Sequence, residues 1–568
     1  MKWKSVVSLC LILQCLLVGC TSKTPDIVPK EEPKLQGEEY DAQMEVASTT
    51  PFGKYPELIT YTLGKMTGAN NSNMPAWDTY EDNAYTRYLK EMLNVQNKNK
   101  FAASDNYYDD IVSMAIATNE LPDIMVVSDR EDLEKLVELD MIEDLSTVYE
   151  TCTSDRIKEI YDSYGESVID NVTFDGKIMA FPETNIEDGP SLLWLRKDWL
   201  DKLNLKEPKT IDDVEYIVKQ FIEKDPGNNG EGETVGIVCD PELTGECGYS
   251  YEYQLDVVFA SYNAYPKQWI HDEDGNVEYG SVQPEAKKAL ARIREMYQSG
   301  VLDPNFLLRT TTNIIELVVE GKCGSFFGPW WTPNNPLMEA MSKNPEANWQ
   351  PYLIQTDKDG TVSYYSQNPT YKYVVVRKGY EHPEIAAKII STIFDYMRYE
   401  DKDAVEIKRY YQLNVDPTAR PLVINIDYND ALARCYDNIT KTLDGELQES
   451  QLEILEYSYY ESCKSYLEEG GDRTAEDWAA YTSRIAACSL LDKAKKVKVP
   501  SLFFAKTETM KSEWWKLKEL EKETYLEIVT GEKPLDYFDS FVEEWYASGG
   551  EAITHEVSEK VNETQVKE

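Results

Sequence analysis

ATNELPDIMVVSD, residues 117–129, carries the strongest evidence for the architecture of this chain. Asn119–Pro122 has the composition of a helix end followed by a turn, because asparagine and proline interrupt regular structure. Ile124–Val127 is a short, continuous apolar run bounded by turn residues, which is typical of a strand buried on both faces. Ser128-Asp129 forms a polar exit from that strand. Helical patterns alternate with strand patterns here, so the stretch predicts βαβ units and a largely parallel sheet.

The same alternation extends along the chain in both directions. Leu58–Leu63 has a β-rich composition, and Asp78–Asn94 shows apolar residues at helical spacing. Asp175-Gly176 predicts a tight turn within a strand pair, and Tyr373–Val376 has the composition of another buried strand. From Asn429 onward the pattern is mostly helical. We therefore expect an α/β fold with a helix-rich C-terminal extension.

Composition disfavours several classes of function. The chain has 568 residues, enough for about two to four lobes, and it carries a net charge of −44. This excess of acidic groups argues against a nucleic-acid partner, whose phosphates must be met by lysine and arginine, and against an anionic membrane surface. Only three histidines occur, far apart in sequence, which disfavours a histidine-built zinc site or catalytic triad.

The N-terminus resembles a bacterial lipoprotein signal. Basic residues precede the apolar run Val6–Val18, and Leu17-Val18-Gly19-Cys20 is similar to a lipobox. We expect cleavage before Cys20 and a lipid on its sulfur, which would anchor the protein on the extracellular face of the cell membrane. The alternative is an ordinary secretory signal. Residues 21–52 are rich in Pro, Glu, Lys and Thr, so we expect a flexible tether there.

Two adjacent tryptophans follow a predicted strand in GSFFGPWWTPNN, residues 324–335. Gly328-Pro329 ends the strand, so Trp330 and Trp331 are expected just beyond it, at the rim where open α/β sheets bind ligands. A flat aromatic face with amide and hydroxyl neighbours suits a neutral, hydroxyl-rich ligand such as a sugar. The alternative is that the tryptophans belong to the hydrophobic core.

DPGNNGEGET, residues 225–234, has a spacing similar to that of a calcium-binding loop. Asp225, Asn229, the Glu231 carbonyl and Glu233 match the first, fifth, seventh and ninth ligand positions. Gly227 stands at the third position, where a side-chain oxygen is required. The sequence therefore leaves two interpretations, a structural calcium ion or an ordinary loop after a helix.

Several strings follow one another in an informative order: the lipobox, ATNELPD (117–123), GKIMAFP (176–182), LWLRKDWLDKL (193–203), the loop 225–234, Pro284–Phe306, Gly328–Trp331 and the tail FDSFVEEWYASGGEAITHEV (538–557). The ordered set resembles the extracellular solute-binding proteins of family 1, the lipoprotein receptors of carbohydrate ABC importers. Within that family the chain is similar to the long, helix-extended lipoproteins of Gram-positive polysaccharide-use systems.

The resemblance implies a two-lobed fold of the periplasmic-binding-protein type (type II), in which each lobe is a mostly parallel sheet flanked by helices. The solute lies between the lobes, which close on it by a hinge motion. Crossings between the lobes are expected near Phe181–Asn185 and Tyr352–Gln355. The expected divisions are a signal peptide (1–20), the tether (21–52), lobe one (53–182 plus 355–400), lobe two (183–354 plus 401–557) and a frayed tail (558–568).

The resemblance also implies ligand-binding residues. Trp330 matches the tryptophan that stacks on a sugar ring in such receptors, and Asp129 matches an acidic residue that hydrogen-bonds sugar hydroxyls. Trp331 either stacks as well or packs inward. The other cleft candidates are Glu183, Asn185, Arg196 (with a structural ion pair as its alternative) and one tyrosine of the loop 249–253, represented by Tyr251.

We expect a binding protein rather than an enzyme. It would be a monomeric, lipid-anchored receptor that captures an oligosaccharide, requires no cofactor and docks on a pair of ABC permeases. One alternative is a glycan-binding sensor or adhesin without transport. Another is a glycoside hydrolase, which needs two carboxylates about 5–10 Å apart, although no string here resembles a hydrolase motif.

Overall fold

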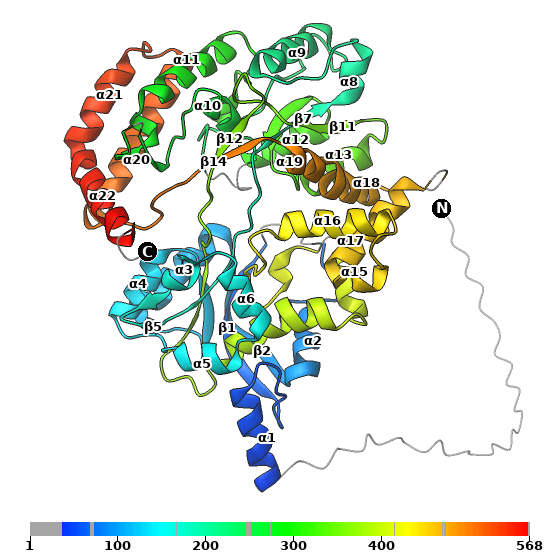
Figure 1. Ribbon diagram of the computed structural model, residues 1–568, viewed down its shortest axis with the longest axis vertical. Helices are drawn as coiled ribbons and strands as arrows, with labels where there is room; N and C mark the ends of the chain where they lie inside the picture. Colours follow the sequence, from blue (N-terminus) through cyan, green and yellow to red (C-terminus); the bar gives the residue numbers. More distant parts are fainter. Residues whose placement is uncertain are drawn as a thin grey trace, which may run out of the picture.

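The computed structural model describes residues 37–68, 73–165, 167–245, 252–272, 274–413, 415–468, 470 and 473–565. The chain forms two lobes stacked along the long axis of the molecule, the first mainly from its N-terminal part and the second mainly from its middle and C-terminal parts (Figure 1). None of the helices within the described ranges is long and apolar enough to cross a membrane. The expectation of a two-lobed α/β fold is confirmed.

The first lobe is built on a five-stranded sheet with helices on both faces. The strands lie in the order β2 (Val95–Ser104), β1 (Ile59–Thr67), β3 (Ile124–Val127), β13 (Tyr373–Val376) and β6 (Phe181–Pro182). One face packs against α2 (Ala84–Leu93), α6 (Asp155–Asp162) and α14 (Glu384–Ser391). The other face packs against α3 (Asp105–Thr118) and α4 (Arg130–Glu138).

Burial on both faces explains the continuous apolar runs of the central strands. In β13, Val374 and Val376 belong to the core on one face of the sheet, whereas Tyr373 and Val375 belong to the core on the other. Successive side chains of a strand point to opposite faces, so a strand covered on both sides has no position for a polar residue. The strand expected at Ile124–Val127 is buried along its whole length for the same reason.

The second lobe contains a three-stranded sheet in the order β10 (Ser325–Gly328), β7 (Leu192–Arg196) and β11 (Trp349–Tyr352). Leu193 and Leu195 face one core, and Leu192 and Trp194 face another. The first core is covered by α9 (Ile211–Lys224), α11 (Pro284–Gln298), α20 (Glu508–Thr530), α21 (Tyr537–Trp545) and α22 (Glu551–Gln565). The second is covered by α12 (Thr311–Val319), α13 (Met338–Lys343), α18 (Ala475–Tyr481) and α19 (Cys488–Lys493).

The expectation of mostly parallel sheets holds only in part. In the first lobe β1 pairs in parallel with β2 and β3, but β13 runs antiparallel to both β3 and β6. In the second lobe β7 is antiparallel to β10 and β11. The reason is the route of the chain. β7 and β13 each begin where the chain arrives from the junction of the lobes, and they therefore run away from it, whereas β3 and β10 run towards it.

The expected lobe boundaries need two corrections. Ile354 packs in the core of the second lobe, and β12 (Val362–Tyr365) pairs with β14 (Lys496–Val499) before the chain returns to the first sheet at β13. The second crossing therefore lies at residues 366–372, downstream of the predicted Tyr352–Gln355. Residues 404–431, which were assigned to lobe two, contribute buried side chains to the core of the first lobe.

The described parts of the predicted tether and of the predicted frayed tail are helical. α1 (Glu38–Thr49) lies within the predicted flexible tether, and its Ala47 is buried against the first lobe. α22 extends to Gln565, and Val561 is buried in the second lobe. The predicted frayed tail is thus part of a helix as far as the structure describes it.

The C-terminal helices stabilise the second lobe through buried aromatic residues. Trp545 is fully buried, and its ring stacks on Tyr279 with centroids 5.2 Å apart. We expect Trp545→Ala to lower the free energy of unfolding by about 3–5 kcal/mol, because it leaves a large cavity. Trp515→Ala is the matched control, since Trp515 on α20 is 64% exposed, and its effect should stay within about 0.5 kcal/mol. Denaturant unfolding of both variants would measure this, and equal effects would contradict it.

Candidate ligand-binding cleft

Three adjoining cavities lie along the second crossing, and the third of them has walls from both lobes. The first has a volume of about 40 Å³, the second about 520 Å³ and the third about 240 Å³. Tyr365 and Gln367 line both the first and the second cavity. Asn368 and Tyr371 line both the second and the third. The crossing 366–372 therefore forms a common wall, and we call the three cavities together the cleft.

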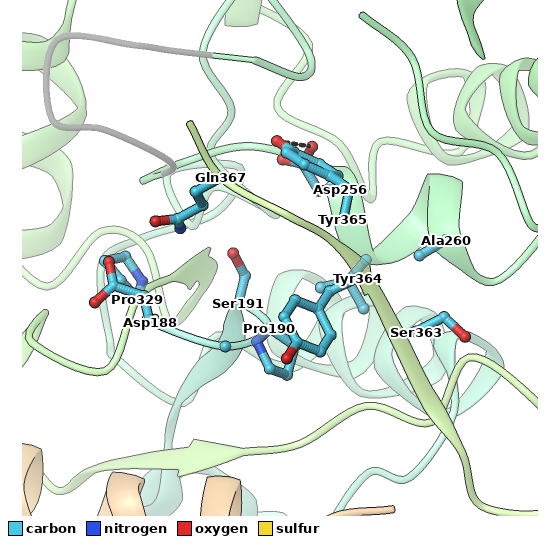
Figure 2. A pocket seen from close by; sticks show the side chains of 12 residues that line it. Asp188, Pro190, Ser191, Asp256, Ala260, Pro329, Ser363, Tyr364, Tyr365 and Gln367 are labelled. Atoms are coloured by element: carbon cyan, nitrogen blue, oxygen red, sulfur yellow. Dashed lines mark hydrogen bonds between the residues drawn. The ribbon is translucent and has the colours of Figure 1, made fainter. Parts of the chain in front are cut away.

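The first cavity is lined by side chains from the second-lobe ends of the two crossings (Figure 2). Asp188 and Ser191 come from the segment that enters β7, and Gln367 comes from the second crossing. Asp256 comes from α10 (Asp256–Ala260), and its Oδ1 accepts hydrogen bonds from the Thr244 hydroxyl at 2.5 Å and the Tyr365 hydroxyl at 3.1 Å. Burial raises the pKa of Asp256.

Asp188 is held in place by one of the predicted tryptophans. Trp330 Nε1 donates a hydrogen bond to Asp188 Oδ1 at 2.8 Å. Burial nevertheless raises the pKa of Asp188 from its ordinary value to about 6, because the ionised carboxylate is poorly solvated there. A carboxylate kept at such a position despite its cost is typical of a functional site.

The walls also carry a polar atom that lacks a partner. Gln367 Oε1 is buried and accepts no hydrogen bond from the described residues. An unsatisfied buried acceptor costs about 1–3 kcal/mol, and a ligand hydroxyl at this point would remove that cost.

Several aromatic side chains form part of the wall of the second cavity. Trp269 and Trp514 stack with ring centroids 6.1 Å apart and form part of its wall. Phe503, Phe504 and Tyr371 complete the aromatic surface, and Phe504 is 41% exposed. These flat apolar faces lie close to the amides of the crossing, a combination that suits a ligand with both apolar faces and hydroxyl groups.

The third cavity joins the two lobes through ion pairs. Asp129 follows β3 and caps α4, where its side chain accepts a hydrogen bond from the Glu131 backbone amide. Lys506, which precedes α20 of the second lobe, contacts Asp129 at 3.4 Å and Glu131 at 2.7 Å. Asp129 thus lines the third cavity with its carboxylate already engaged, and its contact with sugar hydroxyls stays a prediction.

The structure places Trp330 behind the cleft wall rather than at an open rim. Its side chain is only 6% exposed, and the Arg484 guanidinium lies 4.4 Å from the ring centroid. Helices from far downstream cover it, and residues such as Trp478 share its core. Trp331 is half-buried against the same core. The prediction that Trp330 stacks on a sugar does not fit this position, and its contact with the cleft is through Asp188.

Glu183 and Asn185 lie on the first crossing, as expected, and they connect it to the second. Glu183 is buried near Lys372, with 3.6 Å between Oε2 and Nζ. Asn185 Nδ2 donates to the Asn368 carbonyl at 3.1 Å. Both residues therefore act at the junction of the lobes.

Arg196 has a structural role, so its assignment to the cleft was wrong. It is 6% exposed, and its guanidinium donates to both carboxylate oxygens of Asp198, at 2.8 and 2.6 Å. The guanidinium also lies 4.8 Å from the ring centroid of Trp199. Tyr251 and Cys20 lie outside the described residues.

Three of the predicted calcium ligands, Asp225, Asn229 and Glu233, are engaged with other protein groups. Asp225 Oδ1 accepts hydrogen bonds from the Asn229 backbone amide at 2.9 Å and from the Thr234 hydroxyl at 2.7 Å. The Asn229 side-chain nitrogen donates to Thr234 Oγ1 at 3.0 Å, and Glu233 is 3.3 Å from Lys322. Among the described residues no group of three or more His, Cys, Asp and Glu could hold a metal ion.

The third ligand position of this loop cannot gain a side chain. A Cβ on Gly227 would lie 2.6 Å from the Trp199 ring. The loop therefore lacks an oxygen where a calcium site needs one, and hydrogen bonds through Thr234 close it instead. The residues present, Glu231 included, do not fit a calcium ion.

Comparison with known proteins settles the family. Residues 73–395, more than half of the chain, match the model of the bacterial extracellular solute-binding proteins. The chain belongs to this family.

Two relatives show how this solute-binding protein compares with members that have been described. It is 23% identical over 467 residues to the polygalacturonan/rhamnogalacturonan-binding protein YtcQ of Bacillus subtilis (strain 168), covering 80% of this chain and 83% of the relative. It is 24% identical over 248 residues to the fructooligosaccharide ABC transporter substrate-binding protein FusA of Streptococcus pneumoniae, covering 40% and 44% of the two chains.

Solved structures agree on the fold. FusA of S. pneumoniae in complex with kestose aligns with a TM-score of 0.61 at 16% identity, over 90% of this solute-binding protein and 100% of that chain. The alginate-binding protein AlgQ2 without calcium ion aligns with a TM-score of 0.58 at 15% identity, over 89% and 98%. At such identities these structures show the shared fold alone.

The raised pKa of Asp188 predicts a pH-dependent stability difference. The folded protein binds this proton more tightly than the unfolded chain does. Ionisation of Asp188 therefore destabilises the folded state, and this loss of stability grows as the pH rises from about 4 to above 6. Asp188→Asn should therefore raise the melting temperature at pH 7.5, by about 2–4 °C for each kcal/mol regained, and should raise it less at pH 5. Scanning calorimetry at both pH values, with the exposed Asp492→Asn as control, measures this. A gain independent of pH would contradict it.

Because hydrogen bonds close the loop 225–234, we expect calcium to have no effect on the stability of the protein. Adding EDTA or calcium chloride should leave the melting temperature unchanged, and metal analysis of the purified protein should find no calcium. Thr234→Val should destabilise the protein by about 1–3 kcal/mol, because it removes the hydroxyl between Asp225 and Asn229. A fall in melting temperature with EDTA would show that the loop binds a metal.

Proposed function

We propose that this protein captures an oligosaccharide between its lobes by hinge closure and delivers it to an ABC permease pair. The observation that carries the proposal is the cleft along residues 366–372, whose walls combine aromatic faces with amide and hydroxyl groups. Family membership supports it, because the family consists of solute-binding proteins. The names of the relatives, which bind pectic polysaccharides and fructooligosaccharides, point to a carbohydrate ligand.

The dimensions and chemistry of the second cavity suit such a ligand. Its volume of about 520 Å³ lies within the range of about 300–1,000 Å³ that is usual for small-molecule sites. Phe504 and Tyr371 offer ring faces to the apolar side of a sugar, while Gln367 and Asn368 offer amides to its hydroxyls. Specificity would come from the hydroxyls, because an unpaired buried amide is costly.

We also propose the location and assembly state of the protein. The lipobox supports a lipid on Cys20 and a position on the extracellular face of the cell membrane. The protein would act there as a monomer that docks on the permeases, with no cofactor required. A sensor or adhesin would bind the same ligand but would not stimulate ATP hydrolysis by a reconstituted transporter.

One observation favours an enzyme as the second candidate. Asp188 and Asp256 line the same cavity, and burial raises the pKa of both, as occurs for the general acid of glycoside hydrolases. Prolonged incubation of the purified protein with a bound oligosaccharide, followed by mass spectrometry, distinguishes the two functions. Shorter products that are absent from an Asp188→Asn sample would contradict a purely binding role.

Phe504 provides the test of the binding surface. It lines both the second and the third cavity and is partly exposed. We expect Phe504→Ala to weaken oligosaccharide binding about tenfold, which corresponds to about 1.4 kcal/mol of lost apolar contact. Trp515→Ala is the matched control, because Trp515 is exposed outside the three cavities. Calorimetric titration of both variants measures the change, and equal affinities in Phe504→Ala and the control would contradict the assignment of the cleft.

A further inference from the structure

We infer that the ligand is an uncharged oligosaccharide and that the cleft discriminates against acidic ones such as oligogalacturonates. The inference rests on the proposed function, and it concerns the chemical class of the ligand. The charges in the walls of the three cavities carry it.

The first cavity offers carboxylates and no cation. Asp188 and Asp256 line it, and its described wall contains neither lysine nor arginine. A ligand carboxylate placed there would face two like charges in a poorly solvated space, which is strongly unfavourable. A sugar hydroxyl can instead donate a hydrogen bond to either carboxylate.

Two of the three lysines in the wall of the second cavity share one carboxylate. Lys267 lies 3.1 Å from Glu242 Oε2, and Lys522 contacts the other oxygen of the same carboxylate. Both ammonium groups are thus directed at one glutamate rather than into the cavity. Lys518 also lines the second cavity and forms no ion pair with any described residue, but it is exposed to solvent, where water and salt screen its charge.

The third cavity follows the same rule. Lys506 is bound by Asp129 and Glu131. Arg130 is the only arginine in the described walls of the cleft, and its guanidinium is shared between Glu134, at 3.1 Å, and the Asn171 carbonyl. Recognition of a carboxylate usually relies on a free guanidinium that donates two parallel hydrogen bonds. The described walls provide none.

Neutral groups are also available in the walls. Gln367 Oε1 is buried and accepts no hydrogen bond from the described residues, and serine hydroxyls line the walls at Ser191 and Ser501. Such groups exchange hydrogen bonds with sugar hydroxyls without any charge. The overall charge of −44 adds a long-range repulsion against polyanions.

The experiment uses the purified mature protein and two pools of oligosaccharides. Partial hydrolysates of fructan, arabinan and galactan form the neutral pool, and a hydrolysate of polygalacturonan forms the acidic pool. Each pool is incubated with the protein, and captured sugars are identified by mass spectrometry and titrated by calorimetry. We expect capture from the neutral pool and an affinity for trigalacturonate at least about 100-fold lower than for the best neutral ligand.

A variant tests the role of the paired charges. Glu242→Gln frees Lys267 and Lys522, so the ratio of trigalacturonate affinity to neutral affinity should rise at least about tenfold. Glu449→Gln is the control. It frees Lys464, which lies on α17 (Ile454–Leu467) outside the three cavities, and it should leave the ratio unchanged. If Glu242→Gln does not fold, Lys522→Met, which removes one of the two cations, should lower any residual binding of trigalacturonate no more than twofold.

The outcomes separate this inference from the proposed function. Capture from the acidic pool with equal or higher affinity would overturn the inference and leave carbohydrate binding intact. Capture from neither pool would contradict the proposed function itself. An unchanged affinity ratio in Glu242→Gln would show that charge pairing does not determine the selectivity.

Discussion

The architecture depends on the hydrogen bonds that hold the crossing segments side by side. The Glu183 amide donates to the Lys372 carbonyl, and the Asn185 amide donates to the Pro369 carbonyl, each at 2.8 Å. The Thr184 amide donates to the Asn425 carbonyl, which brings a third segment to the same junction. Because these segments are fixed to one another, the position of the crossings helps to determine where a space between the lobes can exist. The three cavities follow the second crossing for this reason.

This constraint also explains why the cleft is polar while the strands beside it are not. β13 is buried on both faces from Tyr373 onward, so it can carry only apolar side chains. The residues immediately before it lie between the lobes, where one side meets solvent or ligand, and they carry amides, hydroxyls and tyrosines. The change from SQNPTY to YVVV within a few residues marks the boundary between the segment at the junction of the lobes and the buried core.

The sequence predicted the elements that depend on local pattern. The buried strand at Ile124–Val127 and the polar position of Asp129 followed from residues next to each other in the chain. Trp330 was different, because the helices that cover it lie more than a hundred residues downstream. No local pattern distinguishes a strand end that is open to solvent from one that distant helices cover. Gln367 and Asp256 were not singled out because an aromatic and amide segment without periodicity resembles an ordinary loop. The mixed polar and aromatic composition just before a buried strand was the only available signal.

Lysines and carboxylates in the walls of the cleft form ion pairs, and among the described residues Lys518 is the exception. Lys267 and Lys522 meet at Glu242, and Lys506 meets Asp129 and Glu131. Pairs of this kind contribute little to stability when they are partly exposed, so stability alone does not account for their position between the lobes. Pairing reduces the positive charge that is available to attract anionic solutes into the cleft. Asp188 remains as a carboxylate that burial disfavours and that Trp330 keeps oriented, and a hydroxyl-bearing solute would give it the hydrogen bonds that solvent supplies elsewhere.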